Sequence, residues 1–276
     1  MAISYDDRVN ARLPDPERFS PRQANIARVY DYLLGGKDNF AADRAVGDQI
    51  MASIPGVHAG VRAQRAVLGR AVRYLVRQAG IRQLIDIGAG LPTAENVHEI
   101  ARRLDRAVRV AYIDNDPVVL AHARALLADD AQTIVIEGDL RDPAHVLETS
   151  ELCGHLDRRQ PVGVLLCGIL HHIMDWENPG AAMHYLCQAL PSGSYVFIHH
   201  LVKSDNPASA GLQAAMARGL GRVRFRTREE ILSLFCGLDL VEPGLVPVSE
   251  WHPDPQTPHL ADPVVGLALA GLARKP

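Results

Sequence analysis

Three acidic side chains lie at what the sequence predicts to be the ends of successive strands. Asp86 stands two residues before the first of two glycines, Gly88 and Gly90, in a turn where the backbone can approach a ligand closely. A carboxylate at this place repels a pyrophosphate and suits a ligand that presents a cationic group. Asp114 and Asp139 follow the next two predicted strands. They could accept hydrogen bonds from the hydroxyls of a ribose and from an exocyclic amine such as that of adenine.

The elements that must position these acids begin near residue 82, where short β-branched runs alternate with helical segments. Strands are predicted at Gln83–Ile87, Arg109–Asp114, Thr133–Glu137, Val162–Cys167 and Tyr195–Leu201. Helices are predicted between them near Thr93–Leu104, Pro117–Leu127, Ala144–Leu156 and Gly180–Leu190. This alternation indicates βαβ units and a parallel sheet that is covered on both faces. The three acids then share the carboxyl edge of the sheet, where ligands bind in open α/β folds.

The two ends of the chain follow other patterns. Residues 1–19 are polar and predict a loose arm, and three helices are expected next, from Ser20-Pro21 to Gly35, at Ala41–Ser53 and at His58–Gln78. In the tail we expect helices at Asn206–Leu220 and Arg228–Phe235 and strands at Leu240–Pro247 and Val264–Ala273. The last strand is expected to be antiparallel, because parallel neighbours need a longer crossover.

The order of these motifs resembles that of class I S-adenosylmethionine-dependent methyltransferases: D-x-G-x-G, an acid after the second strand, and G-D after the third. The segment ANIARVYDYLLGGKDNF at 24–40, together with IDIGAGLPT, YIDNDP and LVEPG, resembles more narrowly an actinobacterial family called S-adenosyl methyltransferases, whose substrate is not implied by the resemblance. The resemblance implies a doubly wound, mostly parallel, seven-stranded Rossmann-like sheet. Residues 1–80 are expected to form an N-terminal arm and helical cap, and residues 81–276 the methyltransferase domain.

The resemblance also implies S-adenosylmethionine as cofactor. It does not name the acceptor, which we expect to be a small molecule. It assigns cofactor-binding roles to residues that follow the first four strands and to the loop between the first two helices: Asp86, Gly88, Ala89, Gly90, Thr93, Asp114, Asn115, Asp139, Leu140, Cys167, Gly168, Lys37 and Asp38. In this assignment the glycine turn lies under the methionine part, the acid before it supports the amino group, and Cys167 and Gly168 line the path of the methyl group. Pro92 stands where the superfamily often has a third glycine, which narrows the geometry of the turn.

Two further features have both a functional and a structural interpretation. The loop Gly35–Phe40 is either an ordinary helix connection or a lid that brings Lys37 or Asp38 to the cofactor. His171 and His172 are either packed side chains or candidates for a general base. Adjacent histidines on a strand point to opposite faces, so a shared metal is not expected. We interpret His199-His200, at the end of the fifth strand, as packed side chains.

Two other functions remain open at this stage. A protein that keeps the cofactor fold but only binds S-adenosylmethionine or S-adenosylhomocysteine would have the same motifs. A nicotinamide-dependent oxidoreductase is disfavoured by Asp86 and by Thr93, which stands where the dinucleotide fingerprint has its third glycine.

Composition and charge narrow the partners and the location. There are 29 Lys and Arg against 32 Asp and Glu, a net charge of −3, so no basic excess favours a nucleic acid. No apolar run approaches the ~20 residues that a membrane helix needs. The N-terminus lacks the pattern of a signal peptide, and no two of the four cysteines are spaced as C-x-x-C. We therefore expect a cytoplasmic protein of unspecified oligomeric state with no metal.

Overall fold

The computed structural model of the chain describes residues 20–92, 95–127, 130–255, 257–261 and 264–276. The expected arm at 1–19 and the expected site residue Thr93 lie outside these ranges. Within the described part of the chain, no helix combines the length and the apolar character that crossing a bilayer requires.

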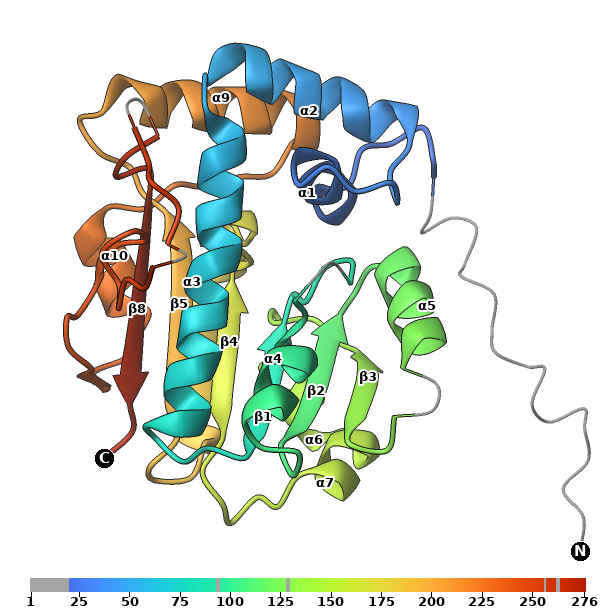
Figure 1. The fold of residues 1–276 in the computed structure, drawn as a ribbon, viewed down its shortest axis with the longest axis vertical. Helices are drawn as coiled ribbons and strands as arrows, with labels where there is room; N and C mark the ends of the chain where they lie inside the picture. Colours follow the sequence, from blue (N-terminus) through green and yellow to red (C-terminus); the bar gives the residue numbers. More distant parts are fainter. Residues whose placement is uncertain (1–19, 93–94, 128–129, 256, 262–263) are drawn as a thin grey trace, which may run out of the picture.

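One sheet of eight strands runs through the described residues (Figure 1). The strands are β1 (Gln83–Ile87), β2 (Arg109–Asp114), β3 (Thr133–Glu137), β4 (Gly163–Cys167), β5 (Tyr195–Leu201), β6 (Asp239–Leu240), β7 (Val246–Pro247) and β8 (Ala268–Arg274). Their order is β3-β2-β1-β4-β5-β8-β6, and β7 also pairs with β8. The first five strands are parallel, and β8 is antiparallel to β5, as predicted. The strand order reverses between β1 and β4, which is where ligands bind in doubly wound sheets.

Helices cover both faces of this sheet (Figure 1). They are α1 (Ile26–Leu33), α2 (Ala41–Ser53), α3 (Val57–Arg77), α4 (Val97–Leu104), α5 (Pro117–Leu126), α6 (Pro143–Glu148), α7 (Ser150–His155), α8 (Pro179–Ala189), α9 (Pro207–Leu220) and α10 (Arg228–Ser233), with short 3-10 turns η2 (Leu170–His172) and η3 (Asp175–Glu177). The doubly wound, mostly parallel α/β fold expected from the sequence is confirmed.

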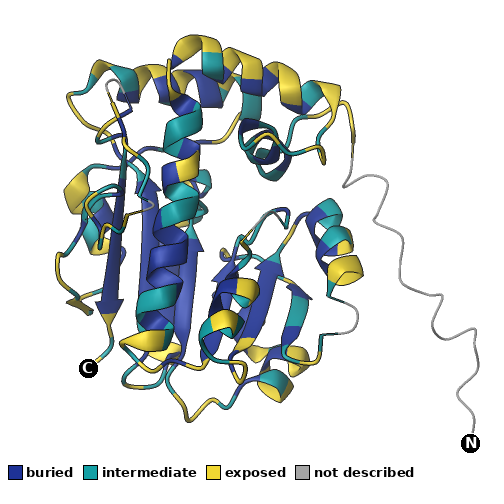
Figure 2. Ribbon diagram, in the orientation of Figure 1, coloured by how far each residue is buried: buried dark blue, intermediate teal, exposed yellow. Residues whose placement is uncertain are grey.

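Side chains of alternate strand residues belong to two separate apolar cores, one on each face of the sheet. Leu84, Leu165 and Phe197 pack with α3 and the N-terminal helices on one face. Their neighbours Ile85 and Leu166 pack with α8 and α10 on the other. Both faces of the central strands are therefore buried, which Figure 2 shows as a dark sheet between partly exposed helices. This explains the near-continuous apolar character of these strands.

Several predicted boundaries are wrong for local reasons. The first helix begins at Ile26 rather than at Ser20, because the Asn25 side chain accepts a hydrogen bond from the Ala27 N–H at 2.7 Å and caps it there. Helix α4 begins at Val97, because Glu95 has a positive φ of 61° and the chain enters the helix only at the Asn96 cap. The helix expected at Ala144–Leu156 is two helices with a break at Thr149, whose ψ of 139° is not helical.

The strand expected at Leu240–Pro247 is also split into two short strands. The sheet therefore has eight strands instead of the expected seven. Gly244, with a φ of 87°, donates its N–H to the Val241 carbonyl at 2.8 Å, so the chain turns between β6 and β7. Both short strands then pair with β8.

The corner between α1 and α2 is built around the buried carboxylate of Asp31. It accepts hydrogen bonds from the Asp38 N–H and the Asn39 side chain, each at 2.9 Å. A Cβ added to Gly36 would lie 1.9 Å from one oxygen of this carboxylate, so glycine is required for the close approach. The segment GGKDNF therefore folds back onto α1.

A second buried acid, Asp43, joins the two helices. It accepts hydrogen bonds from the N–H groups of Asn25 and Phe40 at 2.9 and 2.8 Å, and it pairs with Arg28 at 2.9 Å. Arg28 also lies 3.8 Å from Asp116, at the start of α5. Helix α1 is thus tied both to α2 and to the carboxyl edge of the sheet.

Replacing Gly36 with alanine tests this corner. The added methyl group must displace the buried Asp31 carboxylate, so we expect a loss of about 1–3 kcal/mol in the free energy of unfolding, measured by chemical denaturation. Gly154→Ala is the matched control, because a Cβ there meets no atom within 4 Å. Equal stability of the two variants would contradict the packing described for the corner.

Candidate active site

A cavity of about 1450 Å³, part of it open to solvent, lies at the carboxyl edge of the sheet. The turns after β1 and β4 form its floor, and α1 and α3 form walls. Ten of the residues singled out in the sequence line it: Asp86, Gly88, Ala89, Gly90, Asp114, Asn115, Cys167, Gly168, His171 and His172. The described lining does not include Lys37, Asp38, Asp139 or Leu140.

The turn after β1 comes very close to the turn after β4. Gly88 has a φ of 73°, and a Cβ there would lie 2.8 Å from the Cβ of Ile169. Its N–H donates to the Ile113 carbonyl at 2.8 Å, which holds the turn against β2. Glycine is required at this position both by the backbone conformation and by the contact.

Asp86 is buried in the floor, 4% exposed, on the side of β1 that faces α3. Burial raises the pKa of its carboxyl to about 7, Arg65 opposes that shift, and the neighbouring Asp114 adds to it. The protein therefore holds a carboxyl here that is easily neutralised, and a cation placed next to it would favour its charged form.

Asp114 lies next to this acid and is held by the backbone. One of its oxygens accepts the Gly90 N–H at 2.9 Å, and the other accepts the Asp116 N–H at 2.9 Å. Burial raises the pKa of Asp114, and these backbone hydrogen bonds lower it. Each carboxylate oxygen has a second lone pair, so the fixed side chain can still accept hydrogen bonds from a ligand.

Asp139 lies further out and is already paired. Arg141 bonds both of its oxygens, and the Asn115 side chain donates to it at 2.8 Å. Partial burial acts to raise the pKa of Asp139, but the hydrogen bonds from Arg141 and Asn115 outweigh it and lower the pKa to about 2. Asp139 is thus connected to the cavity through Asn115, which lines it.

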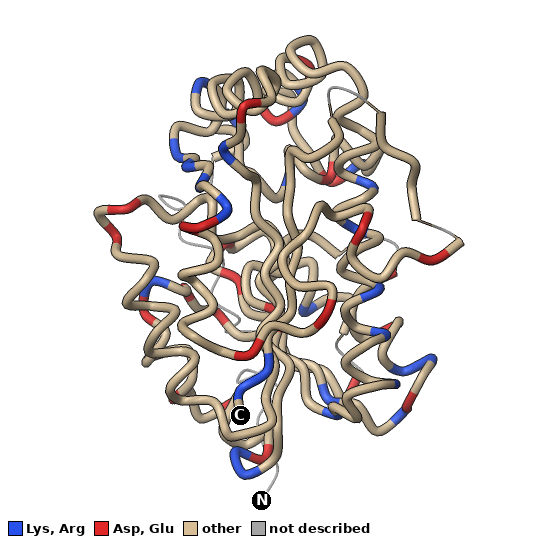
Figure 3. The backbone as a smooth tube through the Cα atoms, turned by 90° about the vertical axis from the view of Figure 1, so that its left-hand side faces the viewer, with Lys and Arg blue, Asp and Glu red and all other residues tan. Residues whose placement is uncertain are grey.

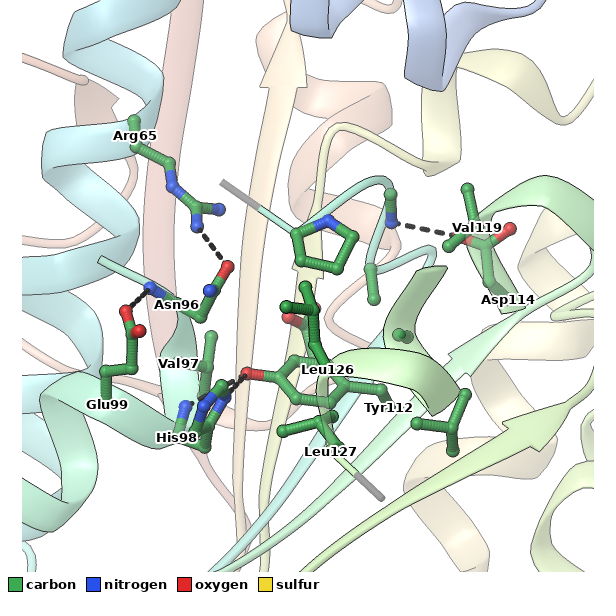
Figure 4. Close-up of a pocket in the computed structure, with 16 residues that line it drawn as sticks. Arg65, Asn96, Val97, His98, Glu99, Tyr112, Asp114, Val119, Leu126 and Leu127 are labelled. Atoms are coloured by element: carbon green, nitrogen blue, oxygen red, sulfur yellow. Dashed lines mark hydrogen bonds between the residues drawn. The ribbon is translucent and has the colours of Figure 1, made fainter. Parts of the chain in front are cut away.

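Arg65 lines the cavity and is a candidate site residue that the sequence argument missed. It extends from α3 over Asp86, and its Nη2 atom donates to the Glu95 carbonyl and to the Asn96 side chain, each at 3.2 Å (Figure 4). Its buried Nε atom has no partner among the described residues. A signal was present: Arg65 lies on the same helical stripe as Val61 and Leu68, where an apolar residue is expected.

Figure 4 shows a smaller cavity of about 670 Å³ on the other side of the glycine turn, between α4 and α5. It shares Arg65, Asp86 and Asp114 with the large cavity. The Tyr112 hydroxyl closes its inner end, where it bonds the His98 N–H and ring Nδ1 at 2.9 and 2.8 Å.

His171 and His172 do not point to opposite faces, and that expectation is wrong. They lie on the 3-10 turn η2 rather than on a strand, and their ring centroids are 4.5 Å apart. Arg226 holds this turn, because it donates to the carbonyls of Leu170 and Ile173, each at 2.8 Å. Burial lowers the pKa of both histidines, that of His171 far below its ordinary value. Both rings are therefore neutral near pH 7.

His199 and His200 have different environments. His200 is packed, with its ring nitrogens 2.7 Å from the Leu201 carbonyl and 3.2 Å from Arg226, as expected. His199 instead lines the large cavity, and neither ring nitrogen has a partner among the described residues. Burial lowers the pKa of His199 to about 4. The described residues contain no cluster of three or more groups that could hold a metal ion.

Helix α1, rather than the loop after it, covers the site. Ile26, Val29, Tyr30 and Leu33 line the cavity, while Lys37 lies at the exposed corner. The Asp38 carboxylate lies 3.8 Å from the His122 ring on the outside of α5.

Comparisons with known proteins show the family to which the chain belongs. The sequence model of the S-adenosyl methyltransferase family matches residues 14–276. A crystal structure of a putative methyltransferase from Thermobifida fusca is 41% identical, with a TM-score of 0.88, and the match covers 96% of this chain and 99% of that one. A DUF574 family protein from Streptomyces avermitilis is 38% identical, with a TM-score of 0.87, and the match covers 92% of this chain and 98% of that one.

An O-methyltransferase family protein from Burkholderia thailandensis is similar in fold alone, at 14% identity and a TM-score of 0.50, over 80% of this chain and 60% of that one. A search of the curated proteins found no match. The family match spans nearly the whole chain, and two solved structures align over almost their full length. The chain therefore belongs to the S-adenosyl methyltransferase family, and it is an enzyme that transfers methyl groups from S-adenosylmethionine.

Proposed function

We propose that S-adenosylmethionine binds in the large cavity, with its methionine part over Gly88–Gly90 and its sulfonium beside Cys167 and Gly168. The observation that carries this placement is the pair of buried carboxylates, Asp86 and Asp114, on the floor of one cavity. A desolvated acid with a raised pKa suits a ligand that carries an ammonium group and a sulfonium. Because Gly88 has no side chain and its turn lies close to Ile169, the ligand would contact the backbone of this turn directly.

Each part of the cofactor then has a partner. The ammonium group lies near Asp86, and the carboxylate meets the Arg65 guanidinium above it. Asp114 accepts the ribose hydroxyls on its free lone pairs. The adenine ring would lie against Asn115, which lines the cavity, and its amine would donate to Asp139, whose carboxylate Arg141 holds in place. Asp139 and the Leu140 N–H lie outside the described lining, so the adenine would meet them by extending past Asn115.

We assign residues 1–80 to an arm and helical cap and residues 81–276 to the methyltransferase domain. The cap is held to the carboxyl edge of the sheet by a hydrogen bond that the Asn25 side chain donates to Asp116. Asp116 is also the N-cap residue of α5. Lys37 and Asp38 lie on the outer rim of this cap, and they would meet a ligand only when the cap moves. Opening at the Asn25–Asp116 contact would admit the cofactor, and closure would exclude water.

The acceptor is a small molecule rather than a nucleic acid in this proposal. Acidic and basic residues are interspersed over the molecule in Figure 3, and the net charge is −3. We further propose that the protein acts in the cytoplasm of an actinobacterium. The two similar structures above come from Thermobifida fusca and Streptomyces avermitilis.

Bound S-adenosylmethionine supplies an already activated methyl group. The side chains of this chain therefore act mainly by alignment and by excluding water, effects worth up to about 7–11 kcal/mol. Where the acceptor must lose a proton, His171 or His172 stands at the end of β4 as a neutral acceptor of it. A protein that binds the cofactor without turnover would have the same site, and a methyl-transfer assay separates the two.

Asp114→Ala removes the proposed ribose contacts. We expect the affinity for S-adenosylhomocysteine, measured by calorimetry, to fall by about 1.5–3 kcal/mol, the usual worth of hydrogen bonds to a charged group. Asp239→Ala, an exposed acid on β6, is the control and should bind normally. Unchanged affinity in Asp114→Ala would exclude this side chain from the site.

The affinity for S-adenosylhomocysteine should also depend on pH. Asp86 becomes protonated as the pH falls through its pKa of about 7, and it then no longer attracts an ammonium group. Binding should therefore weaken by about tenfold between pH 8 and pH 6. The Asp86→Asn variant should bind weakly with a flat profile over this range. A wild-type profile as flat as that of the variant would show that Asp86 does not contact the ammonium group.

The same acid should lower the stability of the ligand-free protein. The carboxyl has a higher pKa when folded, about 7, than its ordinary 3.8, so its protonated form favours folding and stability falls as pH rises from about 4 to 7. At pH 8 we expect Asp86→Asn to be more stable than wild type by about 1–3 kcal/mol, with a correspondingly higher Tm. The difference should shrink towards pH 4. A variant that is less stable at pH 8 would contradict the desolvation argument.

A further inference from the structure

The large cavity extends well beyond the cofactor placed in it above, and the inference drawn here rests on that placement. Its lining continues from the β4 turn to α2, to α9 and to residues of the C-terminal part of the chain, among them Val248, Leu260 and Val264. We call this far part the inner chamber. In Figure 1, α2 and α9 lie side by side at the top of the molecule, and these helices pack against each other.

The walls of the inner chamber are aliphatic. Side chains from α1, α2, α9 and the C-terminal segment line it: Val29, Leu33, Ile50, Leu212, Met216 and Val264. All of these are buried. The four charged residues among the described lining, Arg65, Asp86, Asp114 and Asp116, are at the cofactor end. A charged molecule in the inner chamber would lose its hydration without gaining a partner.

Three histidines lie between the cofactor end of the cavity and the inner chamber. His171 Nδ1, His172 Nε2 and both ring nitrogens of His199 are buried without a partner among the described residues. A buried polar atom left unpaired is costly, and a ligand that donates a hydrogen bond removes that cost. Because burial keeps these rings neutral, each can offer a lone pair to an O–H or N–H group.

His199 is the ring best placed beside the expected methyl path. It is paired in register with Cys167 across β4 and β5. Its carbonyl accepts the Gly168 N–H at 3.3 Å. His171 borders the same turn, with its Cε1 atom 3.7 Å from a Cβ added to Gly168. The unpaired rings therefore lie where an acceptor atom would meet the methyl group.

We propose that the acceptor is an uncharged, largely apolar small molecule that is methylated at a hydroxyl or a neutral ring N–H, and that His199, rather than His171 or His172, accepts the proton. In this step the bond between sulfur and the methyl carbon breaks, and a bond between the acceptor atom and that carbon forms. The electron pair of the broken bond stays on sulfur, which becomes a neutral thioether. The proton of the acceptor passes to the imidazole, so the single positive charge moves from sulfur to His199.

Three probes with the same ring system test the acceptor class. Calorimetry of the S-adenosylhomocysteine complex should give 1-naphthol at least tenfold tighter binding than either 1-naphthoate or 1-naphthylmethylammonium. Equal or better binding of a charged probe would overturn the proposal, and so would the absence of binding by all three. Failure of S-adenosylhomocysteine itself to bind would instead overturn the cofactor placement.

Leu212→Glu tests whether the inner chamber holds the probe. A carboxylate there should weaken 1-naphthol at least tenfold and change S-adenosylhomocysteine affinity less than threefold. Leu212→Phe, which only fills space, covers the case in which the charged variant does not fold, and it should weaken 1-naphthol in the same direction. Normal naphthol binding in the folded variants would place the acceptor elsewhere.

The role of His199 is tested by comparing 1-naphthol with naphthalene, which lacks the hydroxyl. The wild-type protein should bind 1-naphthol about tenfold more tightly than naphthalene, and His199→Leu should bring this ratio close to one. His184→Leu, an exposed histidine on α8, is the control and should keep the wild-type ratio. A ratio that His199→Leu leaves unchanged would exclude His199 as the partner of the acceptor hydroxyl.

Discussion

The site depends on a carboxylate that the fold keeps out of water. Asp86 lies in the middle of the sheet, in register with Tyr112 on β2 and Leu165 on β4, and its carboxylate has no ion pair among the described residues. A buried acid of this kind lowers the stability of the empty protein unless it is protonated. In the proposed complex, the ammonium group of the cofactor would supply the partner that this carboxylate lacks. Binding would then offset the cost of burying the charge and would favour cationic ligands over phosphates.

The sequence predicted the fold correctly where the local pattern of apolar residues agrees with the burial of those residues in the tertiary structure. The strands β1, β2, β3 and β5 have the predicted bounds, because each is a short run of mainly apolar residues that packs within the sheet. The acids could be found because they interrupt such runs at a fixed place. The boundaries that failed depend on a single local feature, such as the Asn25 cap or the turn at Gly244, which competes with the general pattern.

The missed site residues depend on tertiary contacts. Arg65 and His199 are ordinary residues of a helix and a strand, and only the packing of α3 and β5 at the β4 turn brings them to the cavity. The converse holds for the segment GGKDNF. Its glycines and polar residues attracted a ligand-binding interpretation, but in the structure they serve the carboxylate of Asp31 and the turn between two helices. The resemblance of this segment to the family can therefore be explained by its packing role as well as by a role in catalysis.

The two ends of the cavity have different linings, one polar and one aliphatic. Charged and backbone groups line the end near β1 and β2, whereas aliphatic side chains line the end near α2 and α9. Helix α1 contributes to both, because Asn25 reaches Asp116 at one end and Leu33 lines the other. In the proposed arrangement, the cofactor and the acceptor would therefore both contact this helix. A positive charge is favoured near Asp86 and strongly disfavoured in the aliphatic end, so the proton released by the acceptor must be taken up at the boundary between them. The unpaired histidines lie at that boundary, and because burial keeps their rings neutral, each has a lone pair that can take the proton.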